Sequence, residues 1–331
     1  MKFTPRHFDP ASLRKATRLP GGHVAYRAGK EDADLYVYTP RIILALNVAL
    51  ETNRPLLIAG EPGSGKSTLA WNVSRVLGWR YYKRMITSRT QAADLLWTFD
   101  ALRRLNDANA RRLESDQHYV TPGTLWWAFD PKSAVHRGTT AKLTDTQRAD
   151  DPWRGKATPE AVVLLDEIDK ADPDVPNDLL EAFDLKAFTV SETNDRIEAS
   201  PDRKVLLILT TNGERELPPA FMRRCVRLTI SIPQDEKEQE DWFVEIAEQR
   251  MGGTSKLLRP IAREVVRLRG AARKAGLRPP GTGEYLDTLS ACAGLDVTTK
   301  STSWDELMRS VLWKHEHRPS LDEAASGEAE G

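Results

Sequence analysis

The chain has 331 residues, which suits two or three domains, and its 48 Lys and Arg residues balance its 48 Asp and Glu residues. This balance excludes the global basic field that attracts proteins to nucleic acid, so nucleic acid is not an expected partner. Cys225 and Cys292 predict no disulfide framework or metal site, and the lack of an apolar leader or of a run of ~20 apolar residues indicates a cytoplasmic protein without membrane contact.

Residues 1–35 are polar, and we expect an irregular N-terminal extension that packs on the core or on a neighbour. Residues 39–53 predict an amphipathic helix with Thr39 as its N-cap and Pro40 at its first position. Short apolar runs then alternate with helical patterns, which is typical of a parallel sheet buried on both faces. The predicted strands are residues 55–59, 81–87, 161–166, 204–212 and 225–230. The predicted fold class is therefore α/β, with the core over residues 36–232.

The pattern becomes wholly helical after Pro233. Four helical segments predict a second, all-α domain over residues 233–316. They are residues 235–251, 256–276, 281–294 and 303–315. The remaining residues, 317–331, are acidic and small, which predicts a disordered tail.

The stretch "GEPGSGKST" follows the first predicted strand and fits the pattern G-x-x-x-x-G-K-[ST]. Its glycines let backbone N–H groups turn toward phosphate oxygens, Lys66 can reach the β- and γ-phosphates, and Ser67 can ligate Mg²⁺. A glycine-rich turn without a ligand is the alternative, but the strand before it and the helix after it favour a nucleotide site. The predicted nucleotide-binding residues are Gly60, Glu61, Pro62, Gly63, Ser64, Gly65, Lys66, Ser67 and Thr68.

Two later strands end in polar residues that suit phosphate chemistry. Asp166 and Glu167 end "VVLLDEIDK", where Asp166 suits Mg²⁺ and Glu167 suits orienting and deprotonating the attacking water. The alternative is a solvated acidic turn. Asn212 ends "LLILTTN" and is positioned to polarise the γ-phosphate and the water, although a simple turn explains it equally well. Arg223 and Arg224 end a short helix in "PPAFMRRCVRL", and a surface basic pair is the alternative there.

Taken together and in this order, these motifs resemble the Walker A, Walker B, sensor 1 and arginine-finger elements of an AAA+ ATPase. More narrowly, the chain is similar to MoxR-like ATPases, in the helix-2-insert branch of AAA+ proteins. The segments that carry this resemblance are "NRPLLIAGEPGSGKSTLA", "SRTQAADLLWTFDALRRL" and "VLLDEIDKADPDVPNDLLEAFD". The resemblance covers residues 36–295. It implies a five-stranded αβα core with the sensor strand between the two Walker strands, followed by a helical lid.

The resemblance also implies ATP and Mg²⁺ as cofactors and a homo-oligomer, as a hexameric ring. In such a ring Arg224, with Arg223 as its companion, completes the site of the neighbouring subunit. MoxR-like proteins commonly work with von Willebrand factor A domain proteins, so such a protein is a candidate partner.

Two insertions of this branch are expected at residues 118–130 and, as a β-hairpin, at residues 187–199, both facing the central pore or the partner. Trp126 and Trp127 in the first either grip a substrate or are core aromatics.

The sensor 2 position departs from the family pattern, because Glu284 stands where an arginine is typical and Arg278 is the nearby substitute. The expected function is Mg²⁺-dependent ATP hydrolysis that drives the remodelling or activation of a protein partner. Two alternatives remain: a nucleotide-dependent assembly switch with little turnover, and a GTP-driven motor subunit of a restriction system.

Overall fold

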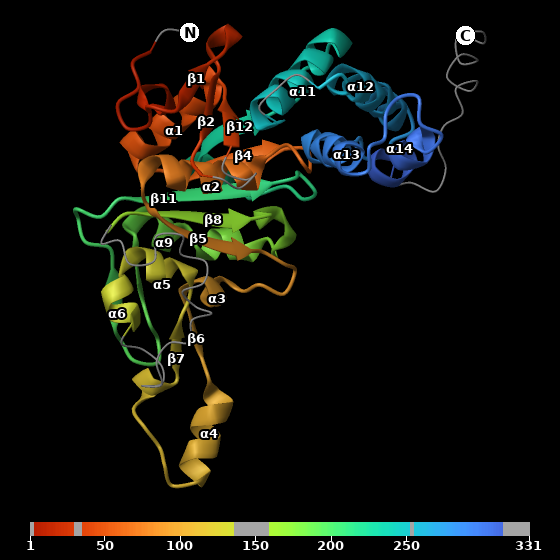
Figure 1. Ribbon diagram of the computed structural model, residues 1–331. Helices are drawn as coiled ribbons and strands as arrows, with labels where there is room; N and C mark the ends of the chain where they lie inside the picture. Colours follow the sequence, from red (N-terminus) through yellow and green to blue (C-terminus); the bar gives the residue numbers. More distant parts are fainter. Residues whose placement is uncertain (1–2, 30–34, 136–158, 252–254, 314–331) are drawn as a thin grey trace. The chain divides into compact units, whose positions relative to one another are not determined.

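The computed structural model describes residues 3–29, 35–135, 159–251 and 255–313 (Figure 1). The chain divides into two compact units. One comprises Met1–Gly60 and Lys66–Thr229, and the other comprises Glu61–Gly65 together with Ile230–Gly331. Five residues of the predicted phosphate loop therefore group with the C-terminal unit, although the strand before them and the helix after them belong to the first. The predicted tail, residues 317–331, lies outside the described residues.

A five-stranded sheet forms the centre of the first unit, as the apolar runs predict. Its strands are β4 (Leu56–Gly60), β5 (Arg80–Met85), β8 (Ala161–Asp166), β11 (Val205–Thr211) and β12 (Val226–Ile230). Their order is β12-β4-β11-β8-β5, and the pairs β4–β11, β11–β8 and β8–β5 are parallel. The prediction that the sensor strand, β11, lies between the two Walker strands is confirmed. Every residue of β8 and β11 is buried, as expected for a sheet covered on both faces.

Helices cover both faces of this sheet (Figure 1). On one face lie α1 (Pro40–Thr52) and α2 (Lys66–Leu77). Helix α1 begins as predicted, since Thr39 Oγ1 accepts a hydrogen bond from the amide of Ile42 at 3.3 Å. The helices that pack on the other face are α3 (Ala92–Leu96), α5 (Thr124–Phe129), α8 (Asp174–Asp178), α9 (Leu180–Leu185) and α10 (Pro219–Arg224).

The N-terminal segment is not irregular, as the sequence suggested, but forms a small antiparallel sheet. Its strands are β1 (Ala16–Arg18), β2 (Val24–Arg27) and β3 (Leu35–Tyr38). Strands of three or four residues are too short to show a clear alternation, which explains why the pattern was missed. Asn47 of α1 ties this segment to the core, because its Oδ1 accepts the amides of Arg6, His7 and Phe8 at 2.9–3.1 Å.

A projecting element separates α3 from α5 (Figure 1). Strand β6 (Trp97–Phe99) leads out, α4 (Ala101–Asn109) follows, and β7 (Val120–Pro122) returns antiparallel to β6. The insertion expected at residues 118–130 is therefore longer and begins earlier, at residue 97. The apolar run after residue 123 is not part of it, because this run forms α5, whose Leu125, Trp126 and Phe129 are fully buried. The short helix α6 (Pro131–Val135) follows α5.

The predicted β-hairpin is confirmed as β9 (Ala187–Thr189) and β10 (Arg196–Glu198), with Ile197 opposite Phe188. It packs on the base of the projecting element, where the rings of Phe188 and Trp97 stack at a centroid distance of 5.6 Å. A small apolar cluster of Val120, Trp126, Ala134, Val190 and Ile197 joins the two insertions. They consequently form one packed body rather than two independent loops.

The C-terminal unit contains the four predicted helices. They are α11 (Glu236–Met251), α12 (Leu258–Lys274), α13 (Thr282–Gly294) and α14 (Trp304–Leu312). Their apolar faces form a separate core that includes Phe243, Val265, Tyr285 and Met308. Within the described residues, no helix combines the length and the apolar character that crossing a membrane requires.

The two tryptophans of α5 are expected to respond differently to truncation. Trp126 is fully buried and its Nε1 donates to Ser133 Oγ at 2.8 Å, whereas Trp127 is partly exposed. Trp126→Ala should lower the free energy of unfolding by about 3–5 kcal/mol, because it removes a large core side chain. Trp127→Ala is the matched control and should cost less than about 2 kcal/mol. Chemical denaturation measures both, and equal losses would contradict the core assignment of Trp126.

Candidate functional site

The predicted phosphate loop connects β4 to α2, and its lysine is held inside the first unit. Lys66 is 6 % exposed, and its Nζ donates to the carbonyl of Gly60 and to Asn212 Oδ1, both at 2.8 Å. Gly63 and Gly65 have φ values of 77° and 88°, a backbone conformation that favours glycine. Ser64 Oγ is buried and has no hydrogen-bond partner among the described residues. The loop thus has the conformation and the unused polar group of a ligand-binding segment.

Asp166 lies at the end of β8 and is 4 % exposed. The hydroxyl of Ser67 lies 2.9 Å from both of its carboxylate oxygens, and Thr210 Oγ1 donates to Oδ1 at 2.6 Å. The structure therefore brings together the two residues that the sequence assigned to Mg²⁺. Thr210 was not predicted, because only the register of β11 beside β8 places it there.

Glu167 follows Asp166 in the left-handed region, with φ 62° and ψ 51°. Its amide donates to Thr210 Oγ1 at 2.8 Å, and its Oε1 accepts from Asn212 Nδ2 at 3.0 Å. Lys170, one turn on, forms an ion pair with Oε2 at 2.7 Å, and the hydrogen bond and charge of Glu167 raise the pKa of Lys170. The carboxylate predicted to act as base is therefore held by two side chains.

Asn212 occupies the centre of this arrangement. Its side chain accepts from Lys66 and donates to Glu167, so a single amide connects the loop lysine with the second carboxylate. Its backbone is fixed by Asp169, which is 1 % exposed and whose Oδ2 accepts the amides of Asn212 and Glu214 at 3.2 and 2.9 Å. The structure therefore places the strand-end asparagine between Lys66 and Glu167, with both its side chain and its backbone amide hydrogen-bonded.

Lys83 of β5 is a site residue that the sequence analysis missed. Its Nζ lies 3.3 Å from Asp166 Oδ2. The register gives the signal, since Met85 pairs with Asp166 and a residue two positions earlier points to the same face. Lys83 therefore adds a positive charge beside the carboxylate predicted to bind Mg²⁺.

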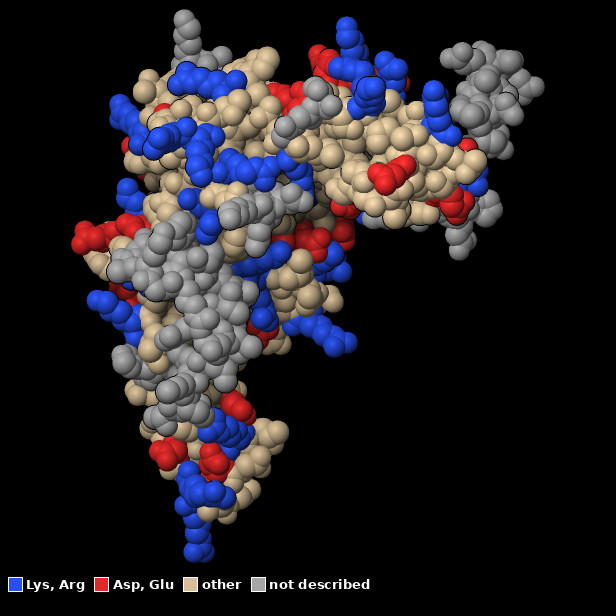
Figure 2. Space-filling model, viewed as in Figure 1, with Lys and Arg blue, Asp and Glu red and all other residues tan. Residues whose placement is uncertain are grey.

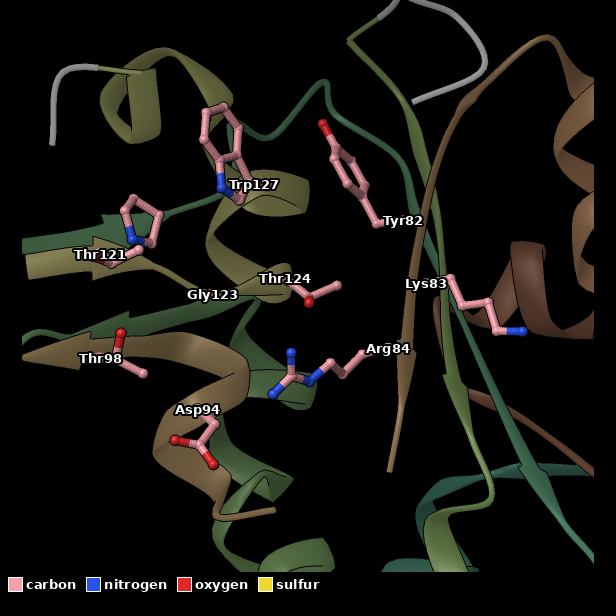
Figure 3. A pocket seen from close by; sticks show the side chains of 10 residues that line it. Tyr82, Lys83, Arg84, Asp94, Thr98, Thr121, Gly123, Thr124 and Trp127 are labelled. Carbon is pink, nitrogen blue, oxygen red and sulfur yellow. The ribbon is translucent and has the colours of Figure 1, made fainter. Parts of the chain in front are cut away.

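The opposite face of β5 borders a cavity of about 320 Å³ (Figure 3). Tyr82 and Arg84 point into it, whereas Lys83 points away. Trp127 of α5 also lines the cavity, as do Thr98 and Thr121 at the base of the projecting element. Strand β5 thus directs Lys83 toward Asp166, and it directs Tyr82 and Arg84 into a cavity at the base of the insertions.

Arg223 and Arg224 end α10, away from this group of residues. Arg224 Nε donates to Asp184 Oδ2 at 2.8 Å and its Nη1 donates to the carbonyl of Ala220 at 3.3 Å. The Arg223 carbonyl accepts from Arg54 at 3.1 Å. The structure does not bring either arginine into contact with Lys66, Asp166, Glu167 or Asn212 of the same chain.

The sensor 2 candidates lie beside the phosphate loop within the C-terminal unit. Arg278 and Glu284 form an ion pair at 2.8 Å, and Glu284 Oε2 also accepts the amide of Gly281 at 3.0 Å. A Cβ added at Gly63 would lie 3.2 Å from this carboxylate and 3.9 Å from the guanidinium. Glu284 therefore caps the start of α13. Arg278 is the residue of this pair whose positive charge lies near the phosphate loop.

The residues present fit a magnesium–nucleotide complex. Mg²⁺ prefers hard oxygen ligands and is generally held by one or two protein oxygens together with phosphates and water. Asp166 and Ser67 provide such oxygens, and the loop amides and Lys66 provide donors for phosphate. Glu167 and Asn212 add an acceptor and a polarising amide beside them.

Comparisons with known proteins agree with this arrangement. The model of a family described as the AAA domain of the dynein-related subfamily matches residues 55–225, more than half of the 331 residues. The chain is also similar to midasin from Giardia intestinalis, with 38 % identity over 59 residues. This match covers 18 % of the present chain and 1 % of the length of that protein.

Thr210 provides a test of this geometry. Thr210→Val preserves the shape of the side chain but removes the hydroxyl that bonds Asp166 and the Glu167 amide. We expect the Mg²⁺-dependent affinity for a fluorescent ADP analogue to fall about 10-fold, as is usual when a group that orients a metal ligand is lost. Thr210→Ser keeps the hydroxyl, so its Mg²⁺-dependent affinity for the analogue should be much closer to that of the wild type. Unchanged Mg²⁺ dependence in a folded Thr210→Val protein would show that Thr210 does not orient the site.

Proposed function

The chain belongs to the AAA domain family, in its dynein-related subfamily. We propose that it assembles into a ring, hydrolyses ATP with Mg²⁺, and uses the energy to remodel or activate a protein partner. One observation carries the hydrolytic part of this proposal. The side chain of Asn212 bridges Lys66 and Glu167, and Thr210 links the Glu167 amide to Asp166, which accepts from Ser67. The binding and hydrolytic groups therefore form one hydrogen-bonded unit.

Each residue of this unit has a role in the proposed hydrolysis. Lys66 offsets the charge of the β- and γ-phosphates, and Asp166 with Ser67 holds Mg²⁺, which when bound neutralises phosphate charge. The Glu167 carboxylate orients the attacking water and takes its proton. Asn212 holds Glu167 and can polarise the γ-phosphate without competing for that proton. For turnover, Glu167 must exchange its ion pair with Lys170 for the water.

In the proposed ring, an arginine of the neighbouring subunit adds positive charge at the γ-phosphate. Arg224 is half-exposed at the end of α10, and its partner in the chain is the equally exposed Asp184, so a stronger anionic partner can replace this contact. A guanidinium remains charged at any working pH and offers a planar fork to phosphate oxygens. We assign Arg224 to the γ-phosphate of the adjacent subunit, with Arg223 beside it.

The proposed partner site lies on the body formed by the two insertions. Leu102 and Leu105 on α4 are 70 % and 57 % exposed, and two exposed arginines, Arg111 and Arg112, follow the helix. Lys and Arg colour the far end of this element in Figure 2. Exposed leucines beside positive charge suit a protein surface that is apolar and acidic. The MoxR-like resemblance makes a von Willebrand factor A domain protein the first partner to test.

A second candidate function is an assembly switch with little turnover. Two observations favour it. Lys170 holds the proposed base, and Glu284 holds Arg278, the candidate for sensing the γ-phosphate from the C-terminal unit. Turnover measured with ATP and with GTP separates this candidate from the proposed remodelling ATPase, and it also tests the choice of nucleotide.

Glu167→Gln tests the proposed base. The amide keeps the shape and the contact with Asn212 but cannot accept the proton, so we expect ATP binding to remain and hydrolysis to fall at least ~100-fold. Phosphate release and the binding of a fluorescent ATP analogue measure the two effects. Glu181→Gln, an exposed carboxylate on α9, is the control. Turnover within a few-fold of wild type in Glu167→Gln would exclude Glu167 as the base.

Arg224→Ala tests the action of this arginine across subunits. The variant should bind ATP but lose roughly 10³-fold in hydrolysis, as expected for a lost arginine finger. Mixing it with Lys66→Ala should restore activity, because roughly a quarter of the sites in randomly mixed rings combine an intact loop with a neighbour's Arg224. No recovery in rings that demonstrably mix would mean that Arg224 acts within its own chain.

A further inference from the structure

Arg269 of α12 is a charged residue that the proposed reaction does not use and that is almost completely buried. It is 1 % exposed, yet every nitrogen of its guanidinium has a partner. Nε donates to Gln239 Oε1 at 3.2 Å, Nη1 to the carbonyl of Pro280 at 2.6 Å, and Nη2 to Glu61 Oε2 at 2.8 Å. A buried charge is stable only with such partners, so the conformation of Arg269 is closely fixed.

The third partner belongs to the phosphate loop. Glu61 directly follows Gly60, and its carbonyl accepts the amide of Ser64 at 3.2 Å, so it forms the first corner of the loop. Arg273, one turn further along α12, places its Nη2 3.7 Å from the other carboxylate oxygen of Glu61. Two arginines of one helix therefore hold the loop through a single side chain.

The contact of Glu61 with Arg269 and Arg273 has two effects on the glycine-rich loop: it orders the loop, and it neutralises a negative charge. Glycines lose more conformational freedom than other residues when they are ordered, and a loop fixed before binding avoids that loss at the moment of binding. The Glu61 carboxylate also adds a negative charge to a segment meant for phosphate, and Arg269 and Arg273 neutralise it.

We propose that Arg269 is a positioning residue that presets the phosphate loop through Glu61, so that the C-terminal unit controls nucleotide affinity. This inference rests on the proposed nucleotide function. Because coupling between binding sites is reciprocal, nucleotide bound to the loop should in turn stabilise α12 and the segment around Pro280.

Substitution of Glu61 tests the inference. Its side chain is 39 % exposed, so it can be replaced without leaving a cavity in the core of the helices. Glu61→Ala should raise the dissociation constant of a fluorescent ADP analogue, and the KM for ATP, about 10-fold, the order expected when one ordered residue is released. The kcat at saturating ATP should stay within about 3-fold, because no group at the reacting atoms changes. Glu61→Gln keeps an acceptor for Arg269 and should lose less affinity than Glu61→Ala.

The control is Glu240→Ala, which removes ion pairs to Arg259 and Arg263 between the same two helices, α11 and α12, but does not touch the loop. Glu240→Ala should bind the ADP analogue with the same affinity as the wild type. Amide hydrogen exchange adds a measurement that a general loss of stability would not explain. Nucleotide should slow exchange in α12 of the wild type and of Glu240→Ala, but not in α12 of Glu61→Ala.

Affinity within 3-fold of wild type in Glu61→Ala, or slowed exchange of α12 by nucleotide in that variant, would overturn the inference. Failure of the proposed function has a different signature. In that case the wild type would not bind the ADP analogue, or Lys66→Ala would bind it as well as the wild type does.

Discussion

A carboxylate buried at the end of a strand, Asp166, is the constraint on which the rest of the site depends. A buried charge requires partners, and those of Asp166 come from three different elements: Ser67 from α2, Thr210 from β11 and Lys83 from β5. Two of these partners come from the strands on either side of β8 and the third from the start of α2, so the arrangement around Asp166 depends on the strand order β11-β8-β5 and on the position of α2.

The sequence predicted those parts of the molecule that local patterns determine. The five strands, the cap at Thr39 and the loop with Lys66 each follow from a few consecutive residues. The residues that pairing alone brings to the site were not predictable, because Thr210 and Lys83 depend on the register of β11 and β5 beside β8. Arg269 was missed for a similar reason, since a charge in an amphipathic helix suggests an exposed position when its partner is 208 residues away.

The two ends of the phosphate loop are held by different partners. At its end, Lys66 is fixed within the first unit by the carbonyl of Gly60 and by Asn212. At its beginning, Glu61 is fixed within the C-terminal unit by Arg269. Between these two points the loop is held by its backbone, since the carbonyl of Glu61 accepts the amide of Ser64 at 3.2 Å and the carbonyl of Gly63 accepts the amide of Gly283 at 3.4 Å.

The left-handed backbone of Glu167 has a consequence for the evolution and engineering of this protein. A residue with a Cβ in this conformation costs of order 1–2 kcal/mol relative to one in an ordinary region, and glycine would avoid that cost. The chain therefore has a carboxylate in a backbone conformation that glycine would adopt at a lower cost. Selection for thermal stability alone could favour a glycine here, so variants chosen only for a higher melting temperature are at risk of losing the carboxylate that we propose as the base.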